Sequence, residues 1–128
     1  MIDILTETIN NSYSPISNKK VAAIVKMKDG TIFRGINVEN PSFKSGLCAE
    51  QVAIASAVTA GYKKGDFESI YIMDNSGNFI NPCFLCRQNF VEFFTDTQII
   101  LVKLNGDTLE YTLDDLCPHA FLMEGKND

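Results

Sequence analysis

The sequence predicts an α/β protein, a three-layer α/β/α sandwich built on a mixed five-stranded sheet. A strong β-hairpin signal lies near the start of the chain, and the segments after it alternate between the strand and the helix pattern. Such alternation is typical of a sheet with helices packed on its faces. At 128 residues the chain has the length of one domain, so residues 1–128 are expected to form a single unit with one core.

The first part of the chain predicts a short helix followed by a hairpin. Apolar residues at helical spacing indicate the helix over residues 3–11. Val21–Met27 and Thr31–Val38 are rich in residues that favour strands. The Asp29-Gly30 pair between these two runs is a strong hairpin signal, so the two strands are expected to pair directly.

Two longer helices alternate with the later strands. Cys48–Tyr62 is rich in alanine and has apolar residues at helical spacing, with Gly61 as a plausible stop. Ser69–Asp74 has the composition of a short buried strand, and Cys83–Phe94 that of a second helix with one apolar face. The remaining predicted elements are strands at Gln98–Leu104 and Thr108–Leu113 and a short helix that starts at Leu113.

Charge and hydropathy argue against two classes of partner. The net charge is −5 and the largest basic clusters are pairs of lysines, whereas nucleic-acid-binding surfaces usually carry a basic stripe. No apolar run approaches the roughly 18 residues of a membrane-spanning helix, and the N-terminal residues are acidic where a signal peptide is basic. We therefore expect no nucleic acid, no membrane and a cytoplasmic location, where cysteines stay thiols or metal ligands.

Two short motifs contain the groups that a catalytic zinc site needs. Residues 48–50 (Cys-Ala-Glu) and residues 82–86 (Pro-Cys-Phe-Leu-Cys) both fall at predicted helix starts. Together they supply one carboxylate, Glu50, and three thiols, Cys48, Cys83 and Cys86. A catalytic zinc has three protein ligands and an open position for water, and a spare carboxylate beside it can move protons. This combination is typical of zinc enzymes that deaminate nucleobases.

Each motif alone also has simpler interpretations. Cys83 and Cys86 could be two buried core residues or a thioredoxin-like redox pair. Glu50 could be a carboxylate that stabilises a helix start through the helix dipole. A purely structural zinc needs four protein ligands, and Cys117 or His119 would have to supply the fourth. The occurrence of both motifs at helix starts favours the catalytic interpretation.

Five segments spread over nearly the whole chain resemble the motifs of one family. They are Tyr13-Ser14-Pro15, Gly35–Asn40, Cys48–Glu50, Pro82–Gln88 and Leu116–Phe121. On these motifs the chain resembles the small cytidine deaminases of the homotetrameric, three-cysteine type. The resemblance implies one zinc per subunit and a homotetramer with sites near the subunit interfaces. It also implies hydrolytic deamination of free cytidine or deoxycytidine to uridine or deoxyuridine and ammonia, a step of pyrimidine salvage.

The resemblance further implies roles for individual residues. Glu50 is expected to move protons among the attacking water, ring N3 and the departing amine. Asn37 and Glu39 are expected to bind the sugar hydroxyls, which fits alternate residues at a strand end that point the same way. The backbone N–H of Ala49 is expected to bind the base, and Phe121 to reach the site of a neighbouring subunit.

Two departures from the family pattern bear on the substrate. Lys19 stands where the family usually has a phenylalanine that packs on the pyrimidine, and Gln51 where it usually has an arginine that bonds the thiolates. We expect the Gln51 amide to bond a thiolate without adding charge, and Arg87 to supply part of the missing positive charge. The alternatives are therefore a deaminase of another cytosine nucleoside, such as blasticidin S, and a non-catalytic zinc-binding member of the family. The resemblance associates Glu39 with the cytidine type and not with the blasticidin type. A third alternative, editing of RNA or DNA, is opposed by the acidic charge.

Overall fold

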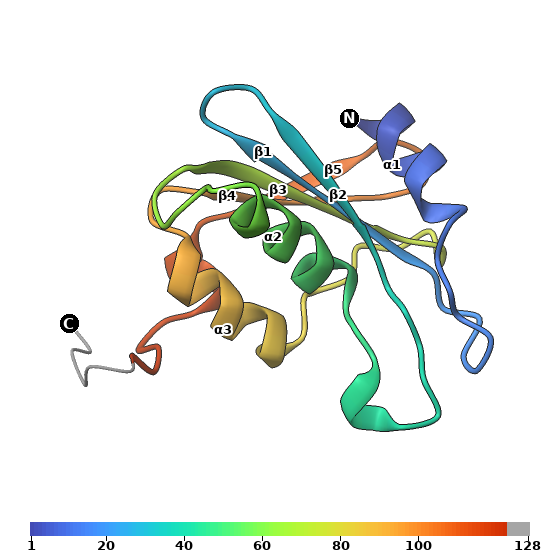
Figure 1. Cartoon of the computed structure of the whole chain (residues 1–128). Helices are drawn as coiled ribbons and strands as arrows, with labels where there is room; N and C mark the ends of the chain where they lie inside the picture. The colour runs from blue at the N-terminus through green and yellow to red at the C-terminus, as the bar shows by residue number, and fades with distance from the viewer. Residues whose placement is uncertain (123–128) are drawn as a thin grey trace.

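A mixed five-stranded sheet forms the centre of the molecule (Figure 1). In the computed structural model, which describes residues 1–122, the strand order is β2-β1-β3-β4-β5. The strands are β1 (Val21–Met27), β2 (Ile32–Ile36), β3 (Phe67–Asp74), β4 (Gln98–Val102) and β5 (Thr108–Tyr111). Neighbouring strands run antiparallel except β3 and β4, which are parallel. The predicted mixed five-stranded sheet is confirmed.

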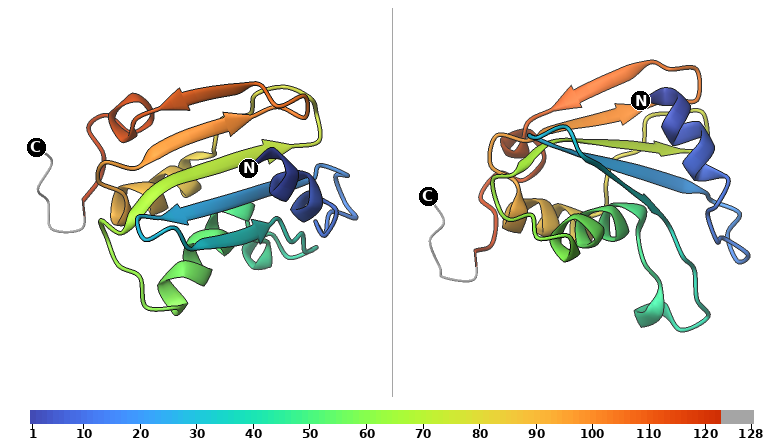
Figure 2. Two further views of the ribbon diagram at one scale, coloured as in Figure 1. Left: turned by 90° about the horizontal axis from the view of Figure 1, so that it is seen from above. Right: turned by 45° about the horizontal axis from the view of Figure 1, so that its top comes forward.

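Helices cover both faces of this sheet, but unequally. The helices are α1 (Ile2–Ile9), α2 (Ala49–Thr59), α3 (Phe84–Phe93) and α4 (Leu113–Leu116), with a short 3₁₀ turn, η1, at Phe43–Ser45. Both α2 and α3 lie on one face, and α1 lies on the other (Figures 1 and 2). The predicted three-layer sandwich is therefore confirmed, with one outer layer much thinner than the other. No helix among residues 1–122 has the length and apolar character needed to span a lipid bilayer.

The alternating side chains of β1 show how the sheet is buried on both faces. Ala23 and Val25 belong to the core cluster under α2 and α3. Ala22 and Ile24 belong to a smaller cluster that packs against Leu5 of α1. A strand that is covered on both faces has a nearly continuous apolar sequence, which explains the run that predicted it.

The two long helices begin at the same end of the sheet (Figure 1). Because β3 and β4 are parallel, their carboxyl ends also meet at one edge, and α3 is the connection between them. Ligand sites in α/β proteins commonly lie at the carboxyl ends of parallel strands, near helix N-termini. The topology therefore brings both cysteine motifs to one place.

Gly35 allows the start of α2 to approach the sheet closely. A Cβ atom at this position of β2 would clash with the carbonyl oxygen of Ala49 and would lie 2.5 Å from the backbone nitrogen of Ala53. Both atoms belong to the helix backbone, which cannot rotate away as a flexible side chain can. Glycine is therefore needed here to seat the helix that carries Ala49 and Glu50.

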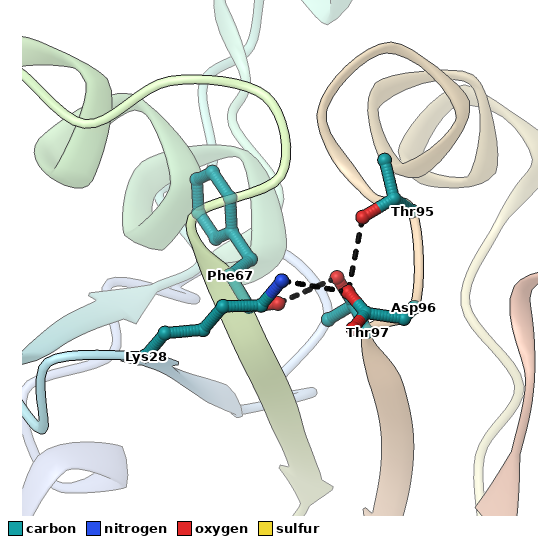
Figure 3. Close-up of polar contacts among 5 residues, drawn as sticks. All are labelled: Lys28, Phe67, Thr95, Asp96 and Thr97. Atoms are coloured by element: carbon teal, nitrogen blue, oxygen red, sulfur yellow. Dashed lines mark hydrogen bonds and ion pairs between the residues drawn. The ribbon is translucent and has the colours of Figure 1, made fainter.

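The amino ends of β3 and β4 are fastened by polar contacts (Figure 3). The buried hydroxyl of Thr97 donates to the carbonyl oxygen of Phe67 at 2.8 Å. Beside it, Lys28 Nζ lies 2.9 Å from Asp96 Oδ1, which also accepts from Thr95 Oγ1 at 3.0 Å. The Thr97 bond joins the starts of the two parallel strands across 30 sequence positions.

Several element boundaries differ from the sequence-based ones by a few residues. The second hairpin strand ends at Ile36 and not at Val38, because Val38 forms isolated bridges with Tyr13 and Leu47. The third strand begins at Phe67, two residues earlier than expected. The hairpin between β1 and β2 closes as predicted, with Gly30 N–H donating to the Met27 carbonyl at 2.9 Å.

Candidate active site

Three cysteine sulfurs converge at the starts of α2 and α3. Cys48 is the N-cap residue of α2, Cys83 is the N-cap residue of α3, and Cys86 lies in the first turn of α3. Their sulfur atoms all lie within 4.8 Å of one another, and Cys48 Sγ is 4.0 Å from Cys83 Sγ. We call these three residues the thiol cluster.

The thiol cluster fits a zinc ion. Sulfurs bound tetrahedrally at about 2.3 Å from one zinc lie roughly 3.8 Å apart, close to the Cys48–Cys83 separation. The two helix N-termini add partial positive charge, which favours thiolates. The hydrogen bond between the Cys86 and Cys48 thiols lowers the pKa of Cys48 to about 7 and raises the pKa of Cys86. Burial and the Glu50 charge oppose ionisation of both thiols, and a bound cation would offset that cost.

Glu50 lies beside the thiol cluster in the first turn of α2. Its side chain is only 5% exposed. Burial raises the pKa of the carboxyl, and hydrogen bonds from its own backbone N–H and from the Cys86 thiol oppose part of that rise. A buried carboxyl whose pKa is raised can hold a proton at pH values where an exposed one cannot, which suits a group that accepts and returns protons.

A cavity of about 590 Å³ brings these groups together with the predicted sugar-binding residues. Its lining includes Cys48, Cys83 and Glu50 from the helix starts, and Asn37 and Glu39 from the segment after β2. The lining also includes Ala49, Gln51 and Lys19. A cavity of this size is typical of sites for small molecules.

Asn37 makes four hydrogen-bonding contacts with the protein through its side chain or backbone carbonyl. Its Oδ1 accepts from the backbone N–H of Val21 at 3.0 Å and from the hydroxyl of Ser12. Its Nδ2 donates to the carbonyl oxygen of Lys19 at 2.7 Å, and its own carbonyl accepts from Tyr13 N–H at 3.1 Å. The amide is thereby held in one orientation at the cavity wall, with one N–H still free of these contacts.

Glu39 is anchored to the segment that precedes β1. Its Oε1 accepts from the backbone N–H groups of Ile16 at 2.9 Å and Ser17 at 3.1 Å, and its Oε2 accepts from the Ser17 hydroxyl. The hydroxyl and N–H of Ser17, with the N–H of Ile16, hold the pKa of Glu39 below its ordinary value, so the carboxylate stays charged.

The side chains of Gln51 and Arg87 contact backbone groups, and the expected bond from the Gln51 amide to a thiolate is absent among residues 1–122. Gln51 Oε1 accepts from the backbone N–H of Cys48 at 2.9 Å, so the side chain caps the helix, while the backbone N–H of Gln51 faces the Cys48 sulfur. Arg87 donates to the carbonyl oxygens of Pro82 at 2.9 Å and Leu116 at 3.1 Å. Its guanidinium also lies over the Phe84 ring, 4.5 Å from the centroid.

The C-terminal residues singled out from the sequence lie at a second cavity of about 470 Å³. Phe121 lines this cavity, is 69% exposed and accepts a hydrogen bond from Gln88 through its carbonyl. Cys117 and His119 line it too. Within residues 1–122, neither belongs to the group of ligand atoms around the thiol cluster, so a fourth protein ligand for a structural zinc is not supported.

Sequence reasoning missed three polar residues that organise the cavity wall. Ser12 and Ser17 hold Asn37 and Glu39, and Asn75 forms three hydrogen bonds with Asn18 and Lys20. Ser17 and Asn75 reach partners 22 to 57 positions away in the chain. No local spacing rule could have identified those pairings, because each residue is an ordinary loop residue in the sequence.

A known protein family matches most of the chain. Residues 1–102 match the family model described as the cytidine and deoxycytidylate deaminase zinc-binding region. The matched segment contains the whole thiol cluster, Glu50, Asn37 and Glu39.

Individual proteins show similarity over almost the full chain. A cytidine deaminase from Mycoplasma genitalium is 37% identical over 94% of this chain and 92% of its own. The crystal structure of a cytidine deaminase from Burkholderia pseudomallei superposes with a TM-score of 0.88 at 36% identity, covering 94% of this chain and 95% of that one. A blasticidin-S deaminase from Bacillus cereus is more distant, at 29% identity over 92% of this chain and 87% of its own.

Proposed function

Because this chain belongs to the cytidine and deoxycytidylate deaminase family, we propose that it converts free cytidine and deoxycytidine to uridine and deoxyuridine. The reaction is hydrolytic: one water is consumed and one ammonia is released. The observation that carries the proposal is a single cavity lined by Cys48, Cys83, the buried carboxyl of Glu50 and the Asn37–Glu39 pair. The sulfur of Cys86 lies within 4.8 Å of the other two sulfurs.

The thiol cluster supplies the metal-binding part of the site. Cys48, Cys83 and Cys86 would hold one zinc as thiolates, leaving one position for a small molecule. When bound, zinc supplies an acidified water that is a good nucleophile near neutral pH.

Glu50 supplies the proton transfers that the reaction needs. Its carboxylate accepts one proton as the water oxygen bonds to C4 of the ring, and it delivers that proton to ring N3. It then accepts the second proton and delivers it to the 4-amino group, which leaves as ammonia when the C4–N bond breaks. Burial helps because the protonated form of Glu50 must persist between these transfers. The backbone N–H of Ala49, at the first helical position, has no acceptor within its helix and is available to the base.

Hydrogen-bond counting supports recognition of one sugar hydroxyl by Asn37 and Glu39. A carboxylate has about four acceptor sites, and contacts with Ile16 and Ser17 use three of those on Glu39. The Asn37 amide has two donor sites, and Lys19 uses one of them. One acceptor and one donor remain, which together match a single hydroxyl group.

The remaining single donor and single acceptor support activity on both the ribonucleoside and the deoxyribonucleoside. Ribose and deoxyribose share the 3′-hydroxyl, so a pair of residues that binds one hydroxyl has little means of separating the two nucleosides. We expect kcat/KM values for cytidine and deoxycytidine that differ by less than about tenfold, since each would form the same charge-assisted hydrogen bond.

The proposal also includes an assembly and a setting. We propose a homotetramer with sites near its interfaces, supported by the exposure of Phe84 (80%), Leu85 (61%) and Phe121 (69%), which leaves apolar side chains for a second copy to cover. Phe121 would then approach a neighbouring subunit's site. A cytoplasmic place in pyrimidine salvage is supported by the four free thiols, which a reducing compartment preserves.

A substrate panel with ammonia detection tests the proposed function. The zinc-loaded protein would be offered cytidine, deoxycytidine, blasticidin S and a cytosine-containing single-stranded oligonucleotide. We expect turnover of the first two nucleosides at comparable efficiency. Turnover of blasticidin S alone would show that the proposed substrates are wrong and that the chain deaminates this other cytosine nucleoside. A full zinc content without turnover of any substrate would indicate a non-catalytic member of the family.

A further inference from the structure

One exposed segment connects the two predicted sugar-binding residues to the rest of the cavity. We call Ile16–Lys20 the strap. At its first end the strap contributes all three of the donors that contact the Glu39 carboxylate, two of them from Ser17. The Ser17 hydroxyl also accepts from the backbone N–H of Lys19 at 3.0 Å, so the same side chain shapes the following turn.

The other end of the strap is fastened by Asn75, which directly follows β3. The backbone N–H of Asn75 donates to the carbonyl of Lys20 at 3.0 Å, and its Oδ1 accepts from the N–H of Lys20 at 3.1 Å. Its Nδ2 donates to the carbonyl of Asn18 at 2.9 Å. Asn75 also begins the loop that leads to Cys83, so one residue joins the strap to the thiol-bearing part of the chain.

The centre of the strap has an unusual backbone and a direct contact with Asn37. Asn18 has a φ of 58°, in the left-handed region that few residues other than glycine adopt, although asparagine tolerates it best. The carbonyl of the next residue, Lys19, accepts from Asn37 Nδ2 at 2.7 Å. A shift of the strap would therefore move a partner of Asn37 as well as the partners of Glu39.

We propose that Ser17 and Asn75 are positioning residues for sugar recognition, which hold the strap so that Glu39 and Asn37 each keep one hydrogen-bonding site directed at the substrate. The inference rests on the proposed function, because it assigns a role within the same site. Neither residue needs to touch the nucleoside. Each acts through the orientation of a carboxylate or an amide that does.

This role predicts a specific kinetic pattern. Removal of the Ser17 hydroxyl leaves Glu39 Oε2 without its protein donor, so the carboxylate can rotate away from the position that accepts the sugar hydroxyl. The base still reaches Glu50 and the thiol cluster, so the loss falls on KM more than on kcat. The preference for a substrate that carries the hydroxyl over one that lacks it should shrink.

The experiment measures the ratio of kcat/KM for deoxycytidine to that for 2′,3′-dideoxycytidine in zinc-loaded protein. The variants are Ser17→Ala, Ser17→Thr, Asn75→Ala and Asn75→Asp. The matched controls are Ser56→Ala, which deletes a hydroxyl bonded only to its own helix at Val52, and Asn105→Ala, which deletes a turn amide bonded to Asp107. Zinc content and a thermal melt accompany each variant.

We expect a ratio of about tenfold or more in the wild type, because the lost hydrogen bond is to a charged group. Ser17→Ala and Asn75→Ala should reduce the ratio at least threefold and raise KM about fivefold, with kcat within about twofold. Ser17→Thr keeps a hydroxyl and should show the wild-type ratio. Asn75→Asp keeps the acceptor for Lys20 N–H, so its ratio should lie between those of the wild type and Asn75→Ala. The two controls should keep the wild-type ratio.

The outcomes separate this inference from the proposed function. If the wild type deaminates deoxycytidine but Ser17→Ala keeps the ratio, or the controls lose it equally, the positioning role is wrong and the function stands. If the wild type deaminates neither nucleoside, the proposed function is wrong and this inference falls with it. If Asn75→Ala fails to fold, the Asn75→Asp ratio decides the role of Asn75.

Discussion

The thiol cluster and the strap border the same cavity, yet they are fixed in place by different means. Each cysteine of the thiol cluster lies at or within one turn of a helix start, so its position follows from local helix geometry. The strap has no regular structure, and it is held by side chains 18 to 57 positions away. One part of the site is thus built by local sequence and the other by long-range hydrogen bonds.

The comparison indicates how the site divides its work. Glu50 and Cys86 are buried, which suits chemistry that depends on fixed charges and little water, while Cys48 and Cys83 keep some exposure. The strap is exposed and Glu39 is only partly buried, which suits binding and release of a sugar. Variants in the first part should therefore change kcat, and variants in the second should change KM.

The largest expected effect comes from Glu50→Gln, which tests whether the thiol cluster and Glu50 (the chemical half of the site) determine kcat, while the strap and Glu39 (the binding half) determine KM. The amide cannot accept and return protons, so kcat should fall by about 10³-fold, within the usual range for a general acid–base group. The three thiols are unchanged, so zinc content should remain one per chain. Ammonia release and metal analysis measure both quantities. Loss of zinc together with activity would show that Glu50 supports the metal and not only the proton transfers.

A second variant, Gly35→Ala, tests whether close seating of α2 fixes the chemical half. The added methyl would meet the backbone of Ala49 and Ala53, so the helix start must shift. We expect a loss of about 1–3 kcal/mol in the free energy of unfolding and a decrease in kcat/KM of about 10²-fold from displacement of Glu50. Denaturant unfolding and steady-state kinetics measure these losses.

Gly106→Ala provides the control for that experiment. Gly106 has a φ of 95° and open space around it, in the turn between β4 and β5, so alanine there strains the backbone without touching the site. The control should lose stability but keep kcat and zinc content. An equal kinetic loss in both variants would mean that general destabilisation, and not the position of α2, explains the result.

Glu39→Gln tests the binding half and should show the opposite pattern to Glu50→Gln. Removal of the charge weakens the hydrogen bonds with the strap and with the sugar, so KM for deoxycytidine should rise about tenfold. The thiol cluster and Glu50 are not altered, so kcat should change by less than about threefold. Steady-state kinetics give both constants. A large fall in kcat with unchanged KM would contradict the division of the site.

The smallest expected effect comes from Lys19→Phe, which sharpens the boundary between the two halves. Lys19 is the strap residue that lines the cavity where the family usually has a phenylalanine, and its flexible aliphatic side chain offers no aromatic ring to stack on the base. An aromatic ring there could pack on the pyrimidine and contribute about 1 kcal/mol, which corresponds to a decrease in KM of roughly fivefold. Lys20→Phe, at the next position and outside the cavity lining, should leave KM unchanged. A rise in KM for Lys19→Phe would show that the ammonium group itself assists binding.

The fold and the thiol cluster could be predicted from sequence because their signals are local. The Asp29-Gly30 hairpin, the alanine-rich helix and the apolar strands each depend on neighbours within a few positions, and all are present in the structure. Cys48 and Cys83 were expected at helix starts, and both are N-cap residues. A three-thiol metal site follows once two such helices begin at the same end of a sheet.

The hydrogen bonds of the side chains around the thiol cluster could not be predicted from sequence, because a long polar side chain can reach several possible partners. Gln51 was expected to bond a thiolate through its amide, and it instead accepts from the backbone N–H of Cys48. Arg87 was expected to supply positive charge, and its guanidinium is held by two backbone carbonyls. Helix ends leave backbone groups without partners, and these groups compete with the sulfurs for hydrogen bonds from long polar side chains. The roles of Asn37 and Glu39 stay predictions, although their places at the cavity wall are consistent with them.

The 4.0 Å approach of Cys48 to Cys83 has a consequence beyond chemistry. An ion held by both sulfurs is a cross-link across 35 sequence positions, and closing such a loop removes freedom from the unfolded chain. Metal affinity thereby becomes folding free energy. We expect chelation to increase digestion by proteases as well as to stop turnover, so that the cellular lifetime of the protein follows the supply of zinc.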